Sequence, residues 1–247
     1  MKDITAIAPL YGSVVPGVPS LRHCSGVLFD FNGTLSDDEG ILRRLFIGLA
    51  QGAGIGPAAD RYQQEMAGRS DREIAEVILP LPSGTPGARR RRKPSARSWH
   101  AWTHLYNVEI ERESPIRPET KDLVGTLHAA GIRLGVVTGA GKGTVLSALR
   151  RAGLADFIDV VITHEDVRQG KPHPEGFLAA ARALELRNPA TVAVFEDSVP
   201  GLQAAAAAGM IPLAVRGTHP PEKLRPLSAA VLDGLRPQWL DLELVRE

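Results

Sequence analysis

Short apolar runs alternate with longer segments of helical periodicity over the second half of the chain. Five runs have the length and composition of buried parallel strands, at residues 27–30, 132–138, 159–163, 191–196 and 211–215. Segments with apolar residues at helical spacing lie between the later runs, at residues 120–130, 144–152, 175–184 and 201–208. Strands that alternate with helices in this way predict an α/β protein with a parallel sheet covered by helices on both faces.

The first two predicted strands are separated by an unusually long stretch. Residues 36–116 show mostly helical spacing, over 40–53, 58–66, 71–79 and 95–113. This is too long for one crossover connection, so we expect an inserted helical domain. The predicted division is an irregular, Pro- and Gly-containing extension over 1–23, an α/β core over 24–36 and 116–247, and a helical insert over 37–115.

A proline- and glycine-rich segment inside the insert leads into a run of like charges, Arg89-Arg90-Arg91-Arg92-Lys93. Like charges repel one another and stay hydrated, so a solvated loop is the favoured interpretation. A contact with an anionic substrate or a nucleic acid is the alternative. Neither an internal repeat nor an extended aromatic stacking pattern supports it, and we expect Trp99 and Trp102, at helical spacing, to pack the insert.

Composition narrows the class of protein further. The chain has 247 residues, 43% hydrophobic content and a formal net charge of +1, so no global field indicates a nucleic-acid or membrane partner. Cys24 is the single cysteine, which excludes an internal disulfide and suits a reducing compartment. The longest apolar stretches are too short for a membrane span, and the first residues lack a signal-peptide core. We therefore expect a cytoplasmic protein, either a monomer or a homodimer.

Polar features follow four of the predicted strands. Asp30 ends the first strand, Thr138-Gly139 follows the second, Lys171 comes shortly after the third, and Glu196-Asp197 ends the fourth. Each has an ordinary explanation when taken alone: a helix cap, a turn, a solvated lysine, or an acidic pair at a helix start. In open parallel sheets, however, ligands bind outside the carboxyl ends of strands. The shared location therefore favours a functional site.

These residues, in this order and spacing, resemble the four sequence motifs of the haloacid dehalogenase superfamily. The resemblance implies a doubly wound, Rossmann-like parallel sheet with a helical cap inserted after the first motif, where residues 36–116 lie. The segments Phe195-Glu196-Asp197-Ser198 and Lys171-Pro172-His173-Pro174 look most like the branch of sugar-phosphate phosphatases and β-phosphoglucomutases. A phosphatase of this kind would act on a small phosphorylated metabolite.

The resemblance also implies a role for each position. Asp30 would attack phosphorus and form an aspartyl-phosphate. Mg²⁺ would be held by Asp30, Asp197, the backbone carbonyl of Asn32, and Glu196 either directly or through water. Thr138 and the Gly139 amide would hold phosphate oxygens, and Lys171 would neutralise charge on the nucleophile and on the transferring group.

Substrate selection would fall to the cap. Arg69 and Arg72 are candidate ligands for an anionic substrate, because guanidinium groups suit anions. A solvated helix start is the favoured alternative for both. A phosphonate hydrolase of the same superfamily would need a cap lysine for a Schiff base, and Lys93 is the only lysine in the insert. That activity is therefore disfavoured.

Asn32 departs from the family pattern, in which an aspartate protonates the leaving oxygen and then activates water. An amide cannot exchange a proton near neutral pH. A phosphatase whose leaving group is protonated by water or a cap residue, or needs little protonation, is the favoured interpretation. Slow hydrolysis of the aspartyl-phosphate and a weakly active or non-catalytic phospho-ligand-binding protein are the alternatives. A mutase is disfavoured because both of its half-reactions need an acid-base group.

Overall fold

The computed structural model describes residues 20–52, 96–112 and 114–241, and its centre is a six-stranded sheet. All neighbouring strands are parallel, in the order β3-β2-β1-β4-β5-β6. Their bounds are β1 Gly26–Phe29, β2 Arg133–Val137, β3 Val160–Ile162, β4 Val192–Glu196, β5 Ile211–Val215 and β6 Ala230–Leu232. The predicted sheet is thus confirmed, and each of the five predicted strands agrees with the structure to within one residue at either end.

The sixth strand is absent from the sequence prediction. It has three residues and lies at an edge of the sheet, paired with β5 alone. A run this short is not long enough for periodicity to distinguish a strand from a turn. Its position far from β1 means that this omission does not affect the placement of the functional residues.

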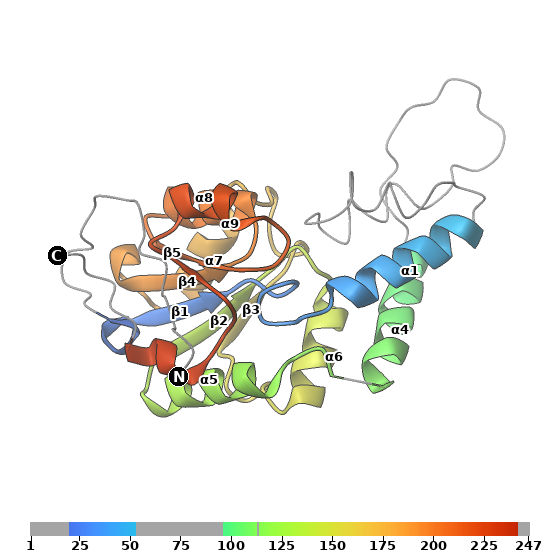
Figure 1. Cartoon of the computed structure of the whole chain (residues 1–247), viewed down its shortest axis with the longest axis horizontal. Helices are drawn as coiled ribbons and strands as arrows, with labels where there is room; N and C mark the ends of the chain where they lie inside the picture. The colour runs from blue at the N-terminus through green and yellow to red at the C-terminus, as the bar shows by residue number, and fades with distance from the viewer. Residues whose placement is uncertain (1–19, 53–95, 113, 242–247) are drawn as a thin grey trace, which may run out of the picture.

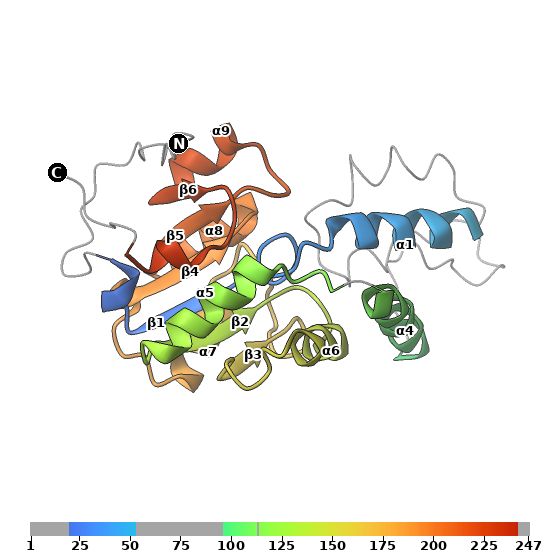
Figure 2. The same cartoon turned by 60° about the horizontal axis from the view of Figure 1, so that its bottom comes forward.

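Helices cover both faces of the sheet (Figures 1 and 2). Val27 and Phe29 of β1 belong to the same buried cluster as residues of α5 and α6, whereas Leu28 belongs to a second cluster with residues of α7 and α8. Because successive side chains of a strand point to opposite faces, this alternation explains a continuous apolar run buried on both sides. The helix bounds are α5 Pro118–Ala129, α6 Lys142–Ala152, α7 Glu175–Ala183, α8 Val199–Ala207 and α9 Pro221–Leu224.

Two helices of the predicted insert lie to one side of the sheet (Figure 1). They are α1 (Glu39–Gly52) and α4 (Ala96–Arg112), and they confirm the helices predicted at 40–53 and 95–113. An ion pair between Arg44 and Glu109, 3.0 Å apart, joins them. The predicted helices at 58–66 and 71–79 and the charged run at 89–93 lie outside the described residues. The division of the chain into domains therefore stays a prediction.

The two segments that join these helices to the sheet lie against each other. The backbone N–H of Asp37 donates to the carbonyl of Pro115 at 2.9 Å. The Arg117 guanidinium also binds the Asp37 carboxylate, with an Nε–Oδ2 distance of 2.9 Å. Chain entry into α1 and chain exit from α4 are thereby held together beside the end of β1.

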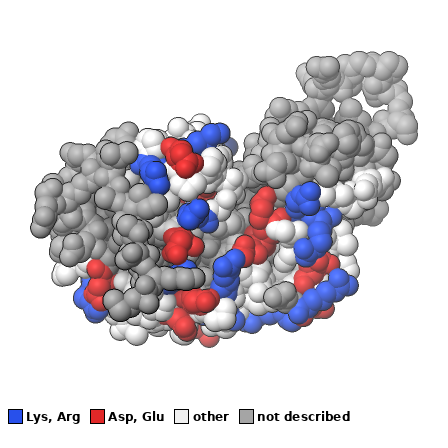
Figure 3. Space-filling model, viewed as in Figure 1, with Lys and Arg blue, Asp and Glu red and all other residues white. Residues whose placement is uncertain are grey.

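The charged side chains on the described surface do not indicate a particular class of partner. Figure 3 shows positive and negative side chains mixed over one face of the described part of the molecule.

Leu21–His23 form a 3₁₀ helix whose Leu21 side chain is fully buried, so the chain is already packed on the core before β1. Within 20–52, 96–112 and 114–241, no helix has both the length and the apolar character needed to cross a membrane.

Candidate active site

Asp30 stands at the carboxyl end of the central strand. Its backbone N–H donates to the carbonyl of Phe195 at 2.9 Å, which extends the β1–β4 ladder by one step. The residue is only 7% exposed, although it carries a carboxylate. A buried charge needs a partner or a bound cation, and the chain supplies the partner from a distant segment.

Lys171 is that partner, and it bridges two carboxylates. Its ammonium group donates to Asp30 Oδ1 and, at 2.5 Å, to Glu196 Oε1. The lysine comes from the loop between β3 and α7 and reaches the site beside the Phe177 ring, 5.4 Å from its centroid. The structure thus brings together Asp30, Lys171 and Glu196, which are far apart in the sequence.

Glu196 is fixed by the start of the helix that follows it. Its Oε2 accepts hydrogen bonds from the backbone N–H of Ser198 at 3.0 Å and from the Ser198 hydroxyl at 2.8 Å. The carboxylate lies over Gly201, where an added Cβ would be 1.8 Å from Oε1. Both oxygens of Glu196 are therefore engaged by protein donors, and only a glycine at 201 leaves room for them.

The Asp197 carboxylate lies next to Gly33, in the turn that follows Asp30. Its Oδ2 accepts a hydrogen bond from the backbone N–H of Thr218 at 2.9 Å. A Cβ built on Gly33 would be 2.2 Å from the same oxygen. Gly33 also has a φ of +77°, in the left-handed region that favours glycine. The glycine after Asn32 is therefore required both by the turn and by the carboxylate.

The three carboxylates form one buried acidic group. Ligand oxygens of Asp30, Glu196 and Asp197 all lie within 4.8 Å of one another. Burial raises the pKa of Asp30 well above its usual value; Lys171 opposes this shift without cancelling it, and the Glu196 and Asp197 charges add to it. Burial, and then Glu196, raise the pKa of Asp197 to about 6. Burial lowers the pKa of Lys171, but the two carboxylates that it binds outweigh burial and raise it.

This electrostatic arrangement suits a bound divalent cation. Three crowded carboxylates with one lysine leave an excess of negative charge, which adds to the effect of burial in raising the pKa values of Asp30 and Asp197. Oxygen ligands from carboxylates are those that Mg²⁺ prefers. The donor set of Asp30, Glu196 and Asp197 therefore fits a hard cation.

Thr138 and Gly139 lie at the same edge of the sheet as Asp30. In the parallel register, Phe29 is opposite Val136, so the residues that follow each strand come out side by side. The Thr138 hydroxyl accepts a hydrogen bond from the backbone N–H of Ala140 at 3.0 Å. This bond folds the Thr138-Gly139 segment into a turn at the start of the loop before α6.

Asn32 is half-buried and has a partner that the sequence analysis did not identify. Its Nδ2 donates to Asp38 Oδ2 at 2.9 Å, and the Tyr106 hydroxyl donates to the same oxygen at 2.5 Å. Asp38 and Tyr106 are fully buried. The acidic pair Asp37-Asp38, a few residues after Asn32 in the sequence, was a signal for this contact, whereas the distant Tyr106 left none.

Other contributors came without a clear sequence signal. Thr218 acts through its backbone, which any residue type supplies, so its identity could not indicate its role. Ser198 is an exception, because serine is among the residues preferred at a helix N-cap, and Ser198 caps α8 by accepting the backbone N–H of Gly201. The candidate substrate residues Arg69 and Arg72 lie outside the described residues, and their role stays a prediction.

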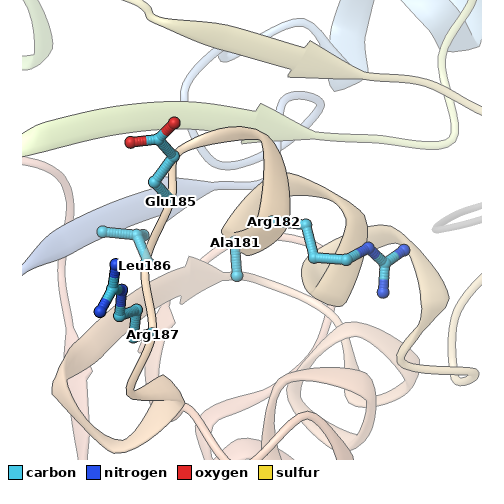
Figure 4. A pocket seen from close by; sticks show the side chains of 5 residues that line it. All are labelled: Ala181, Arg182, Glu185, Leu186 and Arg187. Carbon is cyan, nitrogen blue, oxygen red and sulfur yellow. The ribbon is translucent and has the colours of Figure 1, made fainter.

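A pocket of about 470 Å³ lies elsewhere, beyond the end of α7 (Figure 4). Leu186, which lines it, packs against Gly26 at the start of β1, so the pocket is at the opposite end of the sheet from Asp30. The guanidinium groups of Arg182 and Arg187 lie on opposite sides in this view. The pocket therefore offers no convergent set of polar groups, and the strand-end site is the better candidate.

Comparison with known proteins finds relatives over most of the chain. A family model for haloacid dehalogenase-like hydrolases matches residues 24–209, a range that includes every strand-end residue described above. Validoxylamine A 7'-phosphate phosphatase of Streptomyces hygroscopicus subsp. limoneus is 36% identical over 213 residues, covering 86% of this chain and 95% of the relative. Protein CbbY of Cereibacter sphaeroides is 31% identical over 191 residues, covering 74% and 80% respectively.

A solved structure extends the similarity to three dimensions. The crystal structure of CbbY from Rhodobacter sphaeroides in complex with phosphate superposes with a TM-score of 0.73 and 26% sequence identity. The superposition covers 89% of this chain and 100% of that one.

Proposed function

The chain belongs to the haloacid dehalogenase-like hydrolases, and from this premise we propose that it is a magnesium-dependent phosphatase acting through an aspartyl-phosphate. It is an enzyme of the phosphoric monoester hydrolase class. One observation carries the mechanistic part of the proposal: Asp30, buried at the end of β1, is bound by Lys171 and lies within 4.8 Å of two further carboxylates. This combination supplies a nucleophile, a positive charge and a cation site at one point.

In the first step, an Asp30 oxygen attacks the phosphorus of a phosphate monoester. The new O–P bond forms as the bond to the leaving oxygen breaks, and that oxygen keeps the electron pair. Lys171 is bonded to the attacking carboxylate, so it favours the ionised form of Asp30 and offsets charge on the transferring group. In the second step, water attacks the same phosphorus, and the electron pair of the Asp30 O–P bond returns to the carboxylate.

The residues that would hold Mg²⁺ are Asp30, Asp197 and the backbone carbonyl of Asn32. Glu196 has both oxygens engaged by Lys171 and Ser198, so it would contribute through water or through the field of its charge. When bound, the cation supplies positive charge that offsets the negative charge of the phosphate and the carboxylates. Thr218 and Gly33 keep Asp197 in place for this purpose.

Phosphate oxygens would be held by the Thr138-Gly139 turn and by Lys171. Phosphoryl transfer needs mainly positioning and electrostatic stabilisation, and these groups provide both. The insert, with Arg69 and Arg72, would select the rest of the substrate. The similarity to a phosphatase for validoxylamine A 7'-phosphate supports a small phosphorylated metabolite as the substrate class.

Hydrolysis of p-nitrophenyl phosphate, with and without Mg²⁺, tests the proposal. We expect Asp30→Asn to abolish turnover, and Asp156→Asn, the same change at an exposed carboxylate, to leave it intact. Turnover retained in Asp30→Asn would disprove the nucleophile. A panel of phosphorylated metabolites then identifies the substrate; tight binding without turnover across the panel would favour a phospho-ligand-binding protein, the function that Asn32 otherwise permits.

A further inference from the structure

Asp38 is a fully buried carboxylate that the proposed reaction leaves unused. It directly precedes α1, and its carbonyl accepts the backbone N–H of Leu42 at 2.9 Å. Its side chain points toward Asn32, whose Nδ2 donates a hydrogen bond to Asp38 Oδ2 at 2.9 Å. Burying a carboxylate is costly unless it is hydrogen-bonded, so a role for this contact is to be expected.

Tyr106 of α4 holds the Asp38 carboxylate from the other side. Its hydroxyl donates to Oδ2 at 2.5 Å and lies 3.5 Å from the Ser36 hydroxyl. The phenol is fully buried, so water does not compete for this bond. Two donors from distant parts of the chain thus converge on one oxygen of Asp38, and one of them belongs to the residue two positions after the nucleophile.

This contact sets the orientation of the Asn32 amide. In the structure the amide turns its nitrogen toward Asp38, whose Oδ2 accepts from both Asn32 Nδ2 and the Tyr106 hydroxyl. The amide carbonyl Oδ1 is then on the other branch of the planar group. The branch of the Asn32 amide that does not contact Asp38 is therefore an acceptor, which cannot protonate a leaving group but can accept a hydrogen bond from water.

We propose that Asp38 and Tyr106 are positioning residues that lock Asn32 with its carbonyl toward the water that hydrolyses the aspartyl-phosphate. This inference rests on the proposed function. Water forms the new O–P bond, the Asp30 O–P bond breaks with its electron pair returning to the carboxylate, and the protons of the water leave with the product phosphate. An oriented amide can aim an attacking water without taking its proton.

Two measurements on matched variants test the lock. Asp38→Leu removes the acceptor at similar volume, Asp38→Asn keeps an acceptor oxygen, and Tyr106→Phe removes one hydroxyl while keeping the buried ring. Asp156→Leu makes the same change at an exposed carboxylate outside this contact and serves as the control. The first measurement is the solvent exchange of the Asn32 side-chain amide protons by NMR, assigned from their loss in Asn32→Asp. The second is the single-turnover rate of each step, followed by acid quench.

We expect Asp38→Leu to speed exchange of the Asn32 amide protons by about tenfold, because the variant loses the hydrogen bond that the Asn32 amide donates to the carboxylate. We also expect dephosphorylation to slow by up to about 10²-fold, as for a misplaced reacting group. Phosphorylation of Asp30 should be unchanged, since Asn32 has no proton to give. Asp38→Asn should recover most of both effects, Tyr106→Phe should show smaller losses of the same kind, and Asp156→Leu should show neither.

Unchanged Asn32 exchange in both Asp38→Leu and Tyr106→Phe would overturn the lock, as would equal slowing of both chemical steps. Tyr106→Phe keeps the test valid should Asp38→Leu fail to fold. Absence of a wild-type phosphoenzyme, combined with faster Asn32 exchange in the variants, would uphold the orientation and instead contradict the proposed function.

Discussion

A side chain at Gly33 would disturb both the left-handed backbone of this residue and the neighbouring carboxylate of Asp197. Gly33→Ala, compared with a matched control, separates the two effects. The φ of +77° at this residue is unfavourable for any side chain, and the added Cβ would be 2.2 Å from Asp197 Oδ2. Gly131 has nearly the same φ, +75°, but nothing lies within 4 Å of its added Cβ. Gly131→Ala is therefore a matched control that carries the backbone strain alone.

The magnitudes follow from these two numbers. A left-handed conformation costs a non-glycine residue about 1–2 kcal/mol, which should lower Tm by roughly 2–8 °C in either variant. Ordinary van der Waals contact begins at 3.4 Å, so a Cβ at 2.2 Å forces the Asp197 carboxylate to move by more than 1 Å. A misplacement of about 1 Å in a reacting assembly can reduce the rate by about 10²-fold.

Thermal unfolding and kcat/KM for p-nitrophenyl phosphate with Mg²⁺ test this comparison. Both variants should lose stability, whereas only Gly33→Ala should lose about 10²-fold in kcat/KM. Equal activity in Gly33→Ala and Gly131→Ala would show that the position of Asp197 does not limit catalysis. Such a result would contradict the assignment of Asp197 to the cation site.

Four further outcomes follow from the same contacts. Lys171→Met should destabilise the metal-free protein at pH 8 by about 3–5 kcal/mol in urea denaturation, since it leaves buried carboxylates without their partner; equal stability would contradict the ion pairs. The pKa of Asp197 is raised to about 6, so the folded state binds this proton more tightly than the unfolded state. Without metal, protonation of Asp197 should contribute its full share of the free energy of unfolding below pH 4, and this share, about 3 kcal/mol, should be lost as the pH rises through 6. If the free energy of unfolding of the wild type falls with pH no more steeply than that of Asp197→Asn, this reasoning is refuted. Burial raises the pKa of Cys24 to about 12, so a disulfide reagent should label it slowly at pH 8 until urea is added. Asn32→Asp should lower Tm by placing carboxylates 2.9 Å apart, and adding Asp38→Asn should restore it.

The sheet was predictable because its strands are buried on both faces. Continuous apolar runs such as Val192–Glu196 are distinct from the amphipathic helices between them, and the order of strands and helices restricts the topology. The same reasoning placed Asp30, Thr138 and Asp197 at one edge, because the carboxyl ends of parallel strands come out together. The three-residue strand β6 was not predicted, because so short a segment does not show a hydrophobic period.

The hydrogen-bond partners could not be predicted in the same way. Thr218 supports Asp197 through a backbone N–H, which is independent of residue type. Tyr106 reaches Asp38 across 68 positions of sequence, and its aromatic ring at helical spacing is equally typical of a simple core residue. Side-chain contacts of this kind depend on how α4 packs, which local patterns do not determine. The roles of Arg69 and Arg72, the domain boundaries and a cytoplasmic location stay predictions.

Covalent phosphorylation of Asp30 is the most direct test of the proposed mechanism. Wild-type protein incubated with a ³²P-labelled phosphate monoester and Mg²⁺, then quenched in acid, should carry label that hydroxylamine removes and that peptide mapping assigns to Asp30. A monoester with a good leaving group needs little protonation in the first step, whereas hydrolysis of the intermediate lacks an acid-base group at Asn32, so with such a substrate the label should accumulate before steady state. Turnover without label on Asp30, or label that persists in Asp30→Asn, would contradict the mechanism.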